Sequence, residues 1–471
     1  MDTILFILII ITGFYTAWNI GANDVANAMG TSVGSGALTL KRAVFVAAIL
    51  EFCGAFFFGS HVSQTIQSGI IKTDIFIADP RILVYGMLSA LAASGIWLQI
   101  ASYYGWPVST THSIIGAVVG FGAIVGGLHA VYWENVIFIA VSWIISPLLG
   151  GVLAYYLFTL VRKHIFYTLD PLEATRRLTP VLVFLVLLVL SILLIYEALA
   201  HISFFQHHSQ RLTLCFSIAF LGAFISYMII KKSHLNSGYS LQAKKEYDVL
   251  ISLDKAIKHL ARVRSQSSGA ELAQANAILA DVEALNQQLL RKEEQEIIDK
   301  KYADVEKIFG CLQVVSACMM AFAHGANDVA NAIGPLSAAI ETLKTGLFSV
   351  NNPVPTWALA LGGAGIVTGL ATWGWRVIET IGKKITELTP SRGFCAEFGA
   401  ATTIMLASRL GMPISTTHTL VGAVLGVGFA RGLGAVNLTT TRDIVISWVV
   451  TIPIGALLAI ILFYPIHQIF G

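Results

Sequence analysis

Long apolar stretches alternate with short polar ones along most of the 471 residues. A transmembrane helix needs about 20 consecutive, mainly apolar residues. Stretches of this kind lie near 4–22, 43–60, 82–101, 133–161, 180–200 and 212–230, and then near 308–323, 356–375, 393–410 and 442–465. Two glycine-rich apolar stretches, 108–130 and 414–432, follow prolines and fit either spans or half-helices. The pattern predicts an all-α polytopic membrane protein with about 10–12 transmembrane segments.

Composition agrees with this fold class. The chain is 56% hydrophobic and only 12% charged, with a mean hydropathy of +0.74, whereas soluble domains carry about 25% charged residues. A net charge of +3 without a basic cluster speaks against a nucleic-acid partner. The N-terminus has no basic segment ahead of its apolar run, so no cleavable signal peptide is expected. The five cysteines form no CxxC pair, so neither a disulfide framework nor a metal cofactor is expected.

Between residues 231 and 307 the chain becomes hydrophilic. This segment holds 13 of the 30 Lys and Arg residues and 12 of the 27 Asp and Glu residues. Its apolar positions from Leu272 to Leu289 recur at helical spacing, and Gly269 interrupts the pattern. We therefore predict two amphipathic helices in a hairpin outside the membrane, over 232–307, and interpret them as a solvated linker.

The charges of the short loops predict the orientation. Positive residues flank the pair of spans at 180–200 and 212–230, whereas the loop between these spans has one arginine. By the positive-inside rule, 162–179 and the hairpin at 232–307 lie in the cytoplasm, and both termini lie outside. The expected location is a cell membrane of the bacterial inner-membrane type, with the lipid bilayer surrounding the protein.

The sequence contains an internal duplication. "GANDVANA" occurs at Gly21 and again at Gly325, and "PVSTTHSIIGAVVGFG" at Pro107 is matched by "PISTTHTLVGAVLGVG" at Pro413, with offsets of 304 and 306. The predicted units are a first repeat at 1–165, a connecting pair of spans at 166–231, the hairpin at 232–307 and a second repeat at 308–471. Duplicated halves, often inverted, are typical of secondary transporters, whose sites lie at the repeat interface near the midplane and use broken helices. Two inverted repeats with discontinuous helices are therefore expected.

The GANDVANA motifs place carboxylates and amides at membrane depth. Oxygen ligands of this kind suit hard cations, and ionisable groups within a membrane are functional by default. A helix cap is the alternative, because Asn and Asp are good N-caps, but a cap does not explain three polar residues repeated in both halves. The candidate cation ligands are Asp24, Asn27, Asp328 and Asn331, and the amides of Asn23 and Asn327 flank them.

The PVSTTH and PISTTH motifs favour an anion site. Proline suits the first turn of a helix, where free N–H groups and neighbouring hydroxyls can hold an anion. The candidate residues are Ser109, Thr110 and Thr111 in the first half and Ser415, Thr416 and Thr417 in the second.

Asp24, Asp328 and an anion cannot share one low-dielectric centre without cations or protons to offset them. Co-bound cations are therefore expected, which indicates symport. The secondary candidates are two histidines that follow the threonines and two glutamates in apolar runs. These residues are His112, His418, Glu51 and Glu397.

Together, the paired GANDVANA and P[VI]STTH motifs, the duplication and the hydrophilic insert resemble the inorganic phosphate transporter (PiT) family. The resemblance covers both hydrophobic halves. It implies cation-coupled import of inorganic phosphate by an inverted-repeat fold and a homodimer. In this resemblance sodium is bound by the motif aspartates and asparagines, and phosphate is held by the Ser-Thr-Thr triplets and bordered by Asn23 and Asn327. "GTSVGSGALTLKRA" and the intact "HGANDVANAIGP" resemble sodium-coupled members. Some relatives carry a glutamate in both halves where this chain has Glu397 in one and Met87 at the presumed counterpart.

Three rival functions stay open at this point. One is proton-coupled transport of phosphate, metal phosphate or sulfate. The second is an anion channel, whose flux a cation gradient would not drive uphill. The third is a membrane enzyme with Asp24 and Asp328 as a catalytic dyad, although the motifs contain no nucleophile–base pair.

Overall fold

A computed structural model describes residues 2–198, 207–232, 252–253, 256–257, 259–266, 268–346, 353–375, 377, 388–432 and 438–471. Within these ranges the regular structure is helical, apart from an isolated antiparallel bridge between Ile71 and Val131. The all-α prediction is confirmed. The first predicted helix of the central hairpin lies largely outside the described residues.

The helices of the first half are α1 (Asp2–Gly34), α2 (Leu40–Phe58), α3 (Ser60–Ser68), α4 (Pro80–Tyr104), α5 (Thr110–Val125), α6 (Trp133–Val161), α7 (Pro171–Ala198) and α8 (His208–Lys232). Those of the second half are α10 (Ala270–Asp328), α11 (Ala330–Thr345), α12 (Thr356–Thr372), α14 (Pro390–Arg409), α15 (Thr416–Arg431) and α16 (Leu438–Phe470). Short turns η1 (Thr73–Phe76), η2 (Leu128–Ala130) and η3 (Arg162–Phe166) lie between them.

Among the described residues, seven helices are long and apolar enough to cross a membrane, or eight if α2 and α3, which meet at 60°, form one broken span. Helices α5 and α12 are apolar but shorter. Helix α14 is buried along most of its length and carries the fully buried Glu397. Because α5 and α12 are short and α14 contains several polar residues, the sequence pattern yields a larger number of segments than the length and hydropathy of the helices support.

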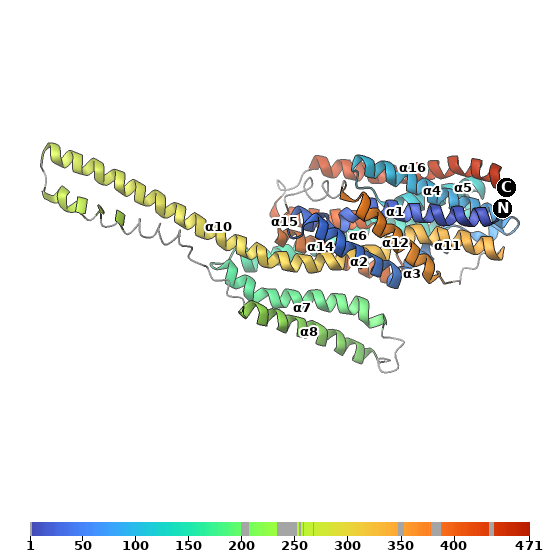
Figure 1. Cartoon of the computed structure of the whole chain (residues 1–471), viewed down its shortest axis with the longest axis horizontal. Coiled ribbons are helices and arrows are strands. Elements are labelled where there is room, and N and C mark those ends of the chain that lie inside the picture. The colour runs from blue at the N-terminus through green and yellow to red at the C-terminus, as the bar shows by residue number, and fades with distance from the viewer. Residues whose placement is uncertain are drawn as a thin grey trace.

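Helix α10 joins the hydrophilic segment to the membrane body without a break. It runs from Ala270 to Asp328, so it crosses residue 307, where the sequence pattern places the end of the hairpin. Figure 1 shows this helix projecting from the body at the end opposite to both termini. On the hydrophilic part of α10, Leu279 is buried, Leu272 and Val282 are partly buried and Leu285 is exposed, so the amphipathic pattern is met only in part.

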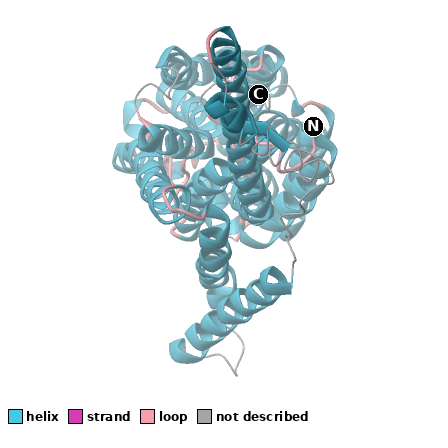
Figure 2. Cartoon of the chain, turned by 90° about the vertical axis from the view of Figure 1, so that its left-hand side faces the viewer, coloured by secondary structure: helices cyan, strands magenta, loops and turns pink. Residues whose placement is uncertain are grey.

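The two halves of the membrane body interlock. Helix α1 packs on α12 of the other half, and the corresponding helix α10 packs on α2. In the same way α5 packs on α16 and α15 packs on α6. Figure 2, viewed from the side on which α10 projects, shows these helices packed around one another into a single bundle. Each half therefore completes the core of the other.

Glycines allow the closest of these crossings. A Cβ atom on Gly21 would collide with the carbonyl oxygen of Ile366 in α12, and one on Gly325 would collide with that of Glu51 in α2. Only residues without a side chain permit backbones to approach this closely. Since Gly21 and Gly325 correspond in the duplication, their contacts identify Ile366 as the counterpart of Glu51.

Candidate functional site

The four polar motifs meet in one enclosed centre. The first GANDVANA motif lies inside the unbroken helix α1, and the second spans the junction at Val329 between α10 and α11. Helices α5 and α15 begin within the P[VI]STTH motifs, with Ser109 and Ser415 as their N-caps. Each of the twelve motif residues named as a primary candidate is at most 2% exposed. Helix α1 keeps its helical course through the first motif, whereas the second motif contains the junction between α10 and α11.

Contacts cross between the halves. The amide of Asn27 donates to Thr417 Oγ1 at 2.8 Å and to Asp24 Oδ1 at 3.0 Å, and Thr417 Oγ1 also lies 3.2 Å from Asp24 Oδ1. At the corresponding place, the amide of Asn331 donates to Thr110 Oγ1 and Thr111 Oγ1, both at 3.1 Å. The asparagines of each half thus hold the helix start of the other half.

The remaining motif asparagines, Asn23 and Asn327, make corresponding hydrogen bonds in the two halves. Asn23 donates from Nδ2 to Ser102 Oγ at 3.1 Å and to Trp106 O at 3.0 Å. Asn327 donates from Nδ2 to Ser408 Oγ at 2.9 Å and to Met412 O at 3.2 Å. These bonds fix the amide groups by their nitrogen ends, so that their oxygens are left for another partner.

Several buried oxygens at this centre have no hydrogen-bond partner among the described residues. They are Asn23 Oδ1, Asn327 Oδ1, Asn331 Oδ1, Asp24 Oδ2 and Asp328 Oδ1. Buried polar atoms are nearly always paired, and these five are acceptors without a donor. A hard cation with an oxygen shell satisfies such atoms, whereas a further acceptor does not.

The helix starts supply donors beside these oxygens. Ser109 Oγ accepts from His112 N, and Ser415 Oγ accepts from His418 N, both at 3.2 Å. The serine hydroxyl protons and the first main-chain N–H groups of α5 and α15 remain available to an anion. Thr416 Oγ1 donates to Asp328 Oδ2 at 2.6 Å, so this threonine already serves the carboxylate rather than an external oxygen.

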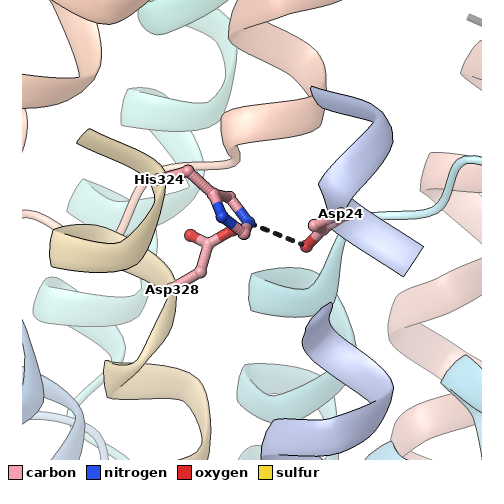
Figure 3. A group of neighbouring side chains, drawn as sticks. All are labelled: Asp24, His324 and Asp328. Atoms are coloured by element: carbon pink, nitrogen blue, oxygen red, sulfur yellow. Dashed lines mark ion pairs between the residues drawn. The ribbon is translucent and has the colours of Figure 1, made fainter. Parts of the chain in front are cut away.

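The structure adds one residue that the sequence interpretation did not single out. His324 lies one turn before Asp328 on α10, with Nε2 3.1 Å from Asp328 Oδ2 and 3.9 Å from Asp24 Oδ2. Figure 3 shows its ring between the two aspartates, Asp24 on α1 and Asp328 on its own helix. These three residues form the group of possible metal ligands found among the described residues. The signal in the sequence was the difference between "HGAND" and "IGAND", which places His324 opposite Ile20.

Glu51 joins this centre through His324. Its Oε1 lies 3.2 Å from His324 Nδ1, and both side chains are fully buried. The counterparts of both residues in the other half are apolar. Ile20 corresponds to His324 by the sequence offset, and Ile366 corresponds to Glu51 by the glycine crossing. The Glu51–His324 pair therefore has no charged counterpart on the other side of the centre, where Ile366 and Ile20 lie. The centre is asymmetric in charge for this reason.

Glu397 forms a separate polar cluster. Its Oε1 accepts from Thr31 Oγ1 at 2.5 Å, Ser32 Oγ at 2.6 Å and Gln313 Nε2 at 3.2 Å, and its Oε2 accepts from Ser316 Oγ at 2.6 Å. Among the described residues, these hydrogen bonds reach no residue of the four motifs, although Thr31 follows Asn27 by one turn of α1.

The counterpart of Glu397 in the first half is Leu91. Ser408 and Ser102 make corresponding bonds to Asn327 and Asn23. Glu397 lies eleven residues before Ser408 on α14, and Leu91 lies eleven residues before Ser102 on α4. This register corrects the assignment of Met87 to that place. The first half therefore has no carboxylate there.

The two motif histidines lie behind the helix starts. His112 packs on Trp143 with ring centroids 3.9 Å apart, His418 packs on Trp448 at 3.6 Å, and the two histidines contact each other at 4.4 Å. His112 Nδ1 lies 3.2 Å from Trp448 O. These contacts connect α5 and α15 to α6 and α16, and they give the histidines a packing role in this structure.

The charge balance of the centre follows from these positions. Three carboxylates, those of Asp24, Asp328 and Glu51, lie within ion-pair distance of the single imidazole of His324. Several unpaired carboxylates are unstable together in a buried setting. Cations beside the orphaned oxygens would balance them and leave the two helix starts to an anion.

Known proteins align with this chain over almost its whole length. Residues 20–459 match the model of the phosphate transporter family. The chain is similar to inorganic phosphate transporter 2-1, chloroplastic, of Arabidopsis thaliana, with 47% identity over 451 residues that cover 95% of this chain and 70% of the relative. It is also similar to a solved structure described as the sodium-dependent phosphate transporter, with a TM-score of 0.79 and 36% identity over 99% of this chain and 100% of that one.

The family match extends over most of the chain and includes all four motifs. The relatives agree with it in name, and they are transporters rather than enzymes, so the catalytic-dyad alternative is dropped. This multi-pass membrane protein belongs to the phosphate transporter family.

Proposed function

We propose that the protein is a secondary active symporter that imports inorganic phosphate, driven by a sodium gradient. The observation that carries the proposal is a fully buried centre in which five orphaned amide and carboxylate oxygens adjoin two serine-capped helix starts. The oxygens suit a hard cation and the helix starts suit an oxyanion. Neither ligand fits the other's place.

In this proposal sodium binds on both sides of the centre. Asp24 and Asn27 hold one ion, and Asp328 and Asn331 hold another. Phosphate oxygens accept from the main-chain N–H groups and serine hydroxyls of the Ser-Thr-Thr triplets. Asn23 and Asn327 border the anion, with Oδ1 turned to a sodium ion beside it, because each Nδ2 already donates to two protein oxygens. The cross-half bonds from Asn27 and Asn331 to the threonines support coupling, because the same amides touch the cation side and the anion side.

The arrangement of the helices supports two inverted repeats. Helix α1 enters the body from the end where the termini lie, and its counterpart α10 enters from the opposite end (Figure 1). Two halves that cross in opposite directions give one site with two possible exits. We place both termini outside and the projecting part of α10 in the cytoplasm, with the protein in a bacterial inner membrane as a homodimer.

The deciding experiment is uptake of radiolabelled phosphate into proteoliposomes at fixed pH. We expect an inward sodium gradient to drive accumulation above equilibrium, and a potassium gradient to give none. Uptake that ignores sodium would refute sodium coupling, and uptake that never exceeds equilibrium would indicate a channel.

Proton-coupled uptake of phosphate, metal phosphate or sulfate is the competing function. The observation that favours it is the contact of His324 with Asp328 and Glu51, because histidine is the usual proton carrier near neutral pH. An inward proton gradient without sodium would then suffice for accumulation. Competition by unlabelled sulfate or by a divalent metal in the same vesicles identifies the anion.

A further inference from the structure

A second polar pocket lies at the end of the body from which α10 projects. It has a volume of about 270 Å³ and is lined by Arg162, Arg392, Arg431, Glu306, Ser391 and Tyr167 among others. Glu306 lies on α10 ahead of Asp328 by 22 residues, which is about 33 Å at 1.5 Å per residue. The pocket is therefore separate from the motif centre.

Its three arginines come from distant parts of the sequence. Arg162 opens the π-helical turn η3 after α6, Arg392 lies in the first turn of α14, and Arg431 is the last residue of α15. The lining residues include three arginines and one glutamate, a net charge of +2. Both oxygens of that glutamate accept from Ser391, from its main-chain N and its Oγ, each at 2.8 Å.

Helix capping explains only part of this cluster. A cation at the C-terminus of α15 is favoured by the helix dipole, and Arg162 donates to Ala430 O in the same last turn and to the hydroxyl of Tyr167. Arg392 lies at the N-terminus of α14, where the dipole disfavours a cation and favours an anion. Capping of helix ends therefore accounts for Arg162 and Arg431 but not for Arg392.

The donor set matches a phosphate group. A guanidinium has five N–H donors, so an arginine that has partners within the protein, as all three have, can donate to a ligand as well. Arginine forks recognise phosphate by paired charge-assisted bonds. A volume of 270 Å³ is at the lower limit of about 300 Å³ for ligand pockets, which suits a phosphate or a small headgroup. π-Helical turns such as η3 are frequent at functional sites.

We propose that this pocket binds a phosphate-bearing anion, supplied either as the headgroup of an anionic phospholipid or as inorganic phosphate. The pocket connects α10 and α14, the helices that carry Asp328 and Glu397, so its ligand would join the ends of two helices that pass through the transport centre. The proposal does not depend on which cation drives transport.

The first arm of the test uses lipid. Full-length protein is reconstituted in nanodiscs of phosphatidylcholine with and without phosphatidylglycerol, and bound phosphatidylglycerol is counted by native mass spectrometry after extraction. The test variant is Arg392→Gln with Arg431→Gln, since Arg162 also supports α15. The control is Lys163→Gln, an exposed cation next to Arg162 that does not line the pocket. Loss of charge-assisted bonds should weaken retention by about ten-fold or more in the test variant and leave the control unchanged.

The second arm uses inorganic phosphate in phosphatidylcholine alone. Equilibrium dialysis of radiolabelled phosphate should show a second bound phosphate in the wild type that the test variant lacks, if free phosphate is the ligand. A change in the lipid arm only identifies the headgroup. Arg392→Lys with Arg431→Lys keeps the charge and should retain part of the binding, and unchanged thermal unfolding of each variant shows that it is folded. The proposal is overturned if the wild type binds neither the lipid headgroup nor a second phosphate. It is also overturned if the wild type and the test variant bind equally in both arms.

Discussion

Asp24 is fully buried in the middle of α1, and it is held by side chains rather than by solvent. Asn27 and Thr417 contact its Oδ1, whereas its Oδ2 has no hydrogen-bond partner among the described residues. Asp328 shows the same division, with Thr416 on Oδ2 and nothing on Oδ1. Each carboxylate is thus oriented by one oxygen and offers the other. In the proposed function, the second oxygen of each carboxylate would bind sodium.

Replacement of either aspartate by asparagine tests this assignment. Asp24→Asn and Asp328→Asn remove the negative charge but keep the shape, so we expect sodium-driven phosphate uptake to fall by roughly 10- to 100-fold, the effect of losing a bond to a charged group. Uptake per inserted protein in proteoliposomes is the measurement. Asp304→Asn, on the same helix as Asp328 but paired with the exposed Lys307, is the matched control. Near-normal uptake in both variants would exclude these aspartates as cation ligands.

The Glu51–His324 pair provides a second residue-level prediction, which concerns stability. Removing one partner of a buried pair leaves an uncompensated charge and costs about 3–5 kcal/mol, whereas an apolar replacement of both is often neutral. We expect Glu51→Ile or His324→Ile alone to lower the thermal stability in detergent strongly. The double variant, which copies Ile366 and Ile20 of the other half, should recover much of it. Equal losses that simply add would show that the two side chains are not coupled.

At the scale of elements, the position of these side chains depends on close helix crossings. Gly21 brings α1 against α12, and Gly325 brings α10 against α2. Because Asp24 and Asp328 each lie about one turn after such a glycine, each crossing fixes the position of one aspartate, Asp24 relative to α12 and Asp328 relative to α2. A wider crossing would move the carboxylates away from the helix starts of α5 and α15.

Gly325→Ala tests the crossing. The new Cβ would meet the backbone of Glu51, which cannot move aside as a flexible side chain can, so a loss of about 1–3 kcal/mol in stability is expected, as for other overpacked sites. Gly310→Ala is the matched control, because it lies on the same helix with nothing within 4 Å of its Cβ position. Thermal unfolding of the two purified variants gives the comparison. Equal melting temperatures would mean that the crossing relaxes without cost.

At the scale of the whole molecule, neither half can form the centre alone. Asn27 of the first half donates to Thr417 of the second half. Asn331 of the second half donates to Thr110 of the first half. The same exchange occurs in the packing of α5 on α16 and α15 on α6. With the motif residues enclosed, sodium and phosphate are expected to stabilise one closed arrangement of both halves together.

Ligand-dependent stability tests this expectation. A ligand that binds the native state at roughly 100 times its Kd adds about 2.7 kcal/mol. We expect phosphate to raise the melting temperature in sodium buffer more than in potassium buffer of equal ionic strength, and Asp24→Asn to remove the difference. A phosphate shift that is independent of the cation would contradict shared binding.

The sequence by itself determined the fold class, the duplication and the chemical identity of the centre. Apolar stretches of membrane length cannot form anything but helices there, and residues such as Asp24 and Ser109 are conspicuous because polar side chains at that depth need a reason. The N-cap serines also follow from local chemistry, since a proline and a hydroxyl mark a helix start.

Only the tertiary structure decided how the motifs are paired and which further residues join them. Local patterns cannot show that Asn27 reaches Thr417 across 390 positions, or that Leu91 rather than Met87 corresponds to Glu397. His324 escaped the sequence interpretation because it stands just before the motif, and its meaning depends on Glu51, a residue of another helix that a glycine crossing brings within 3.2 Å. Contacts of this kind arise from the packing of whole helices, which the order of residues along one helix does not encode.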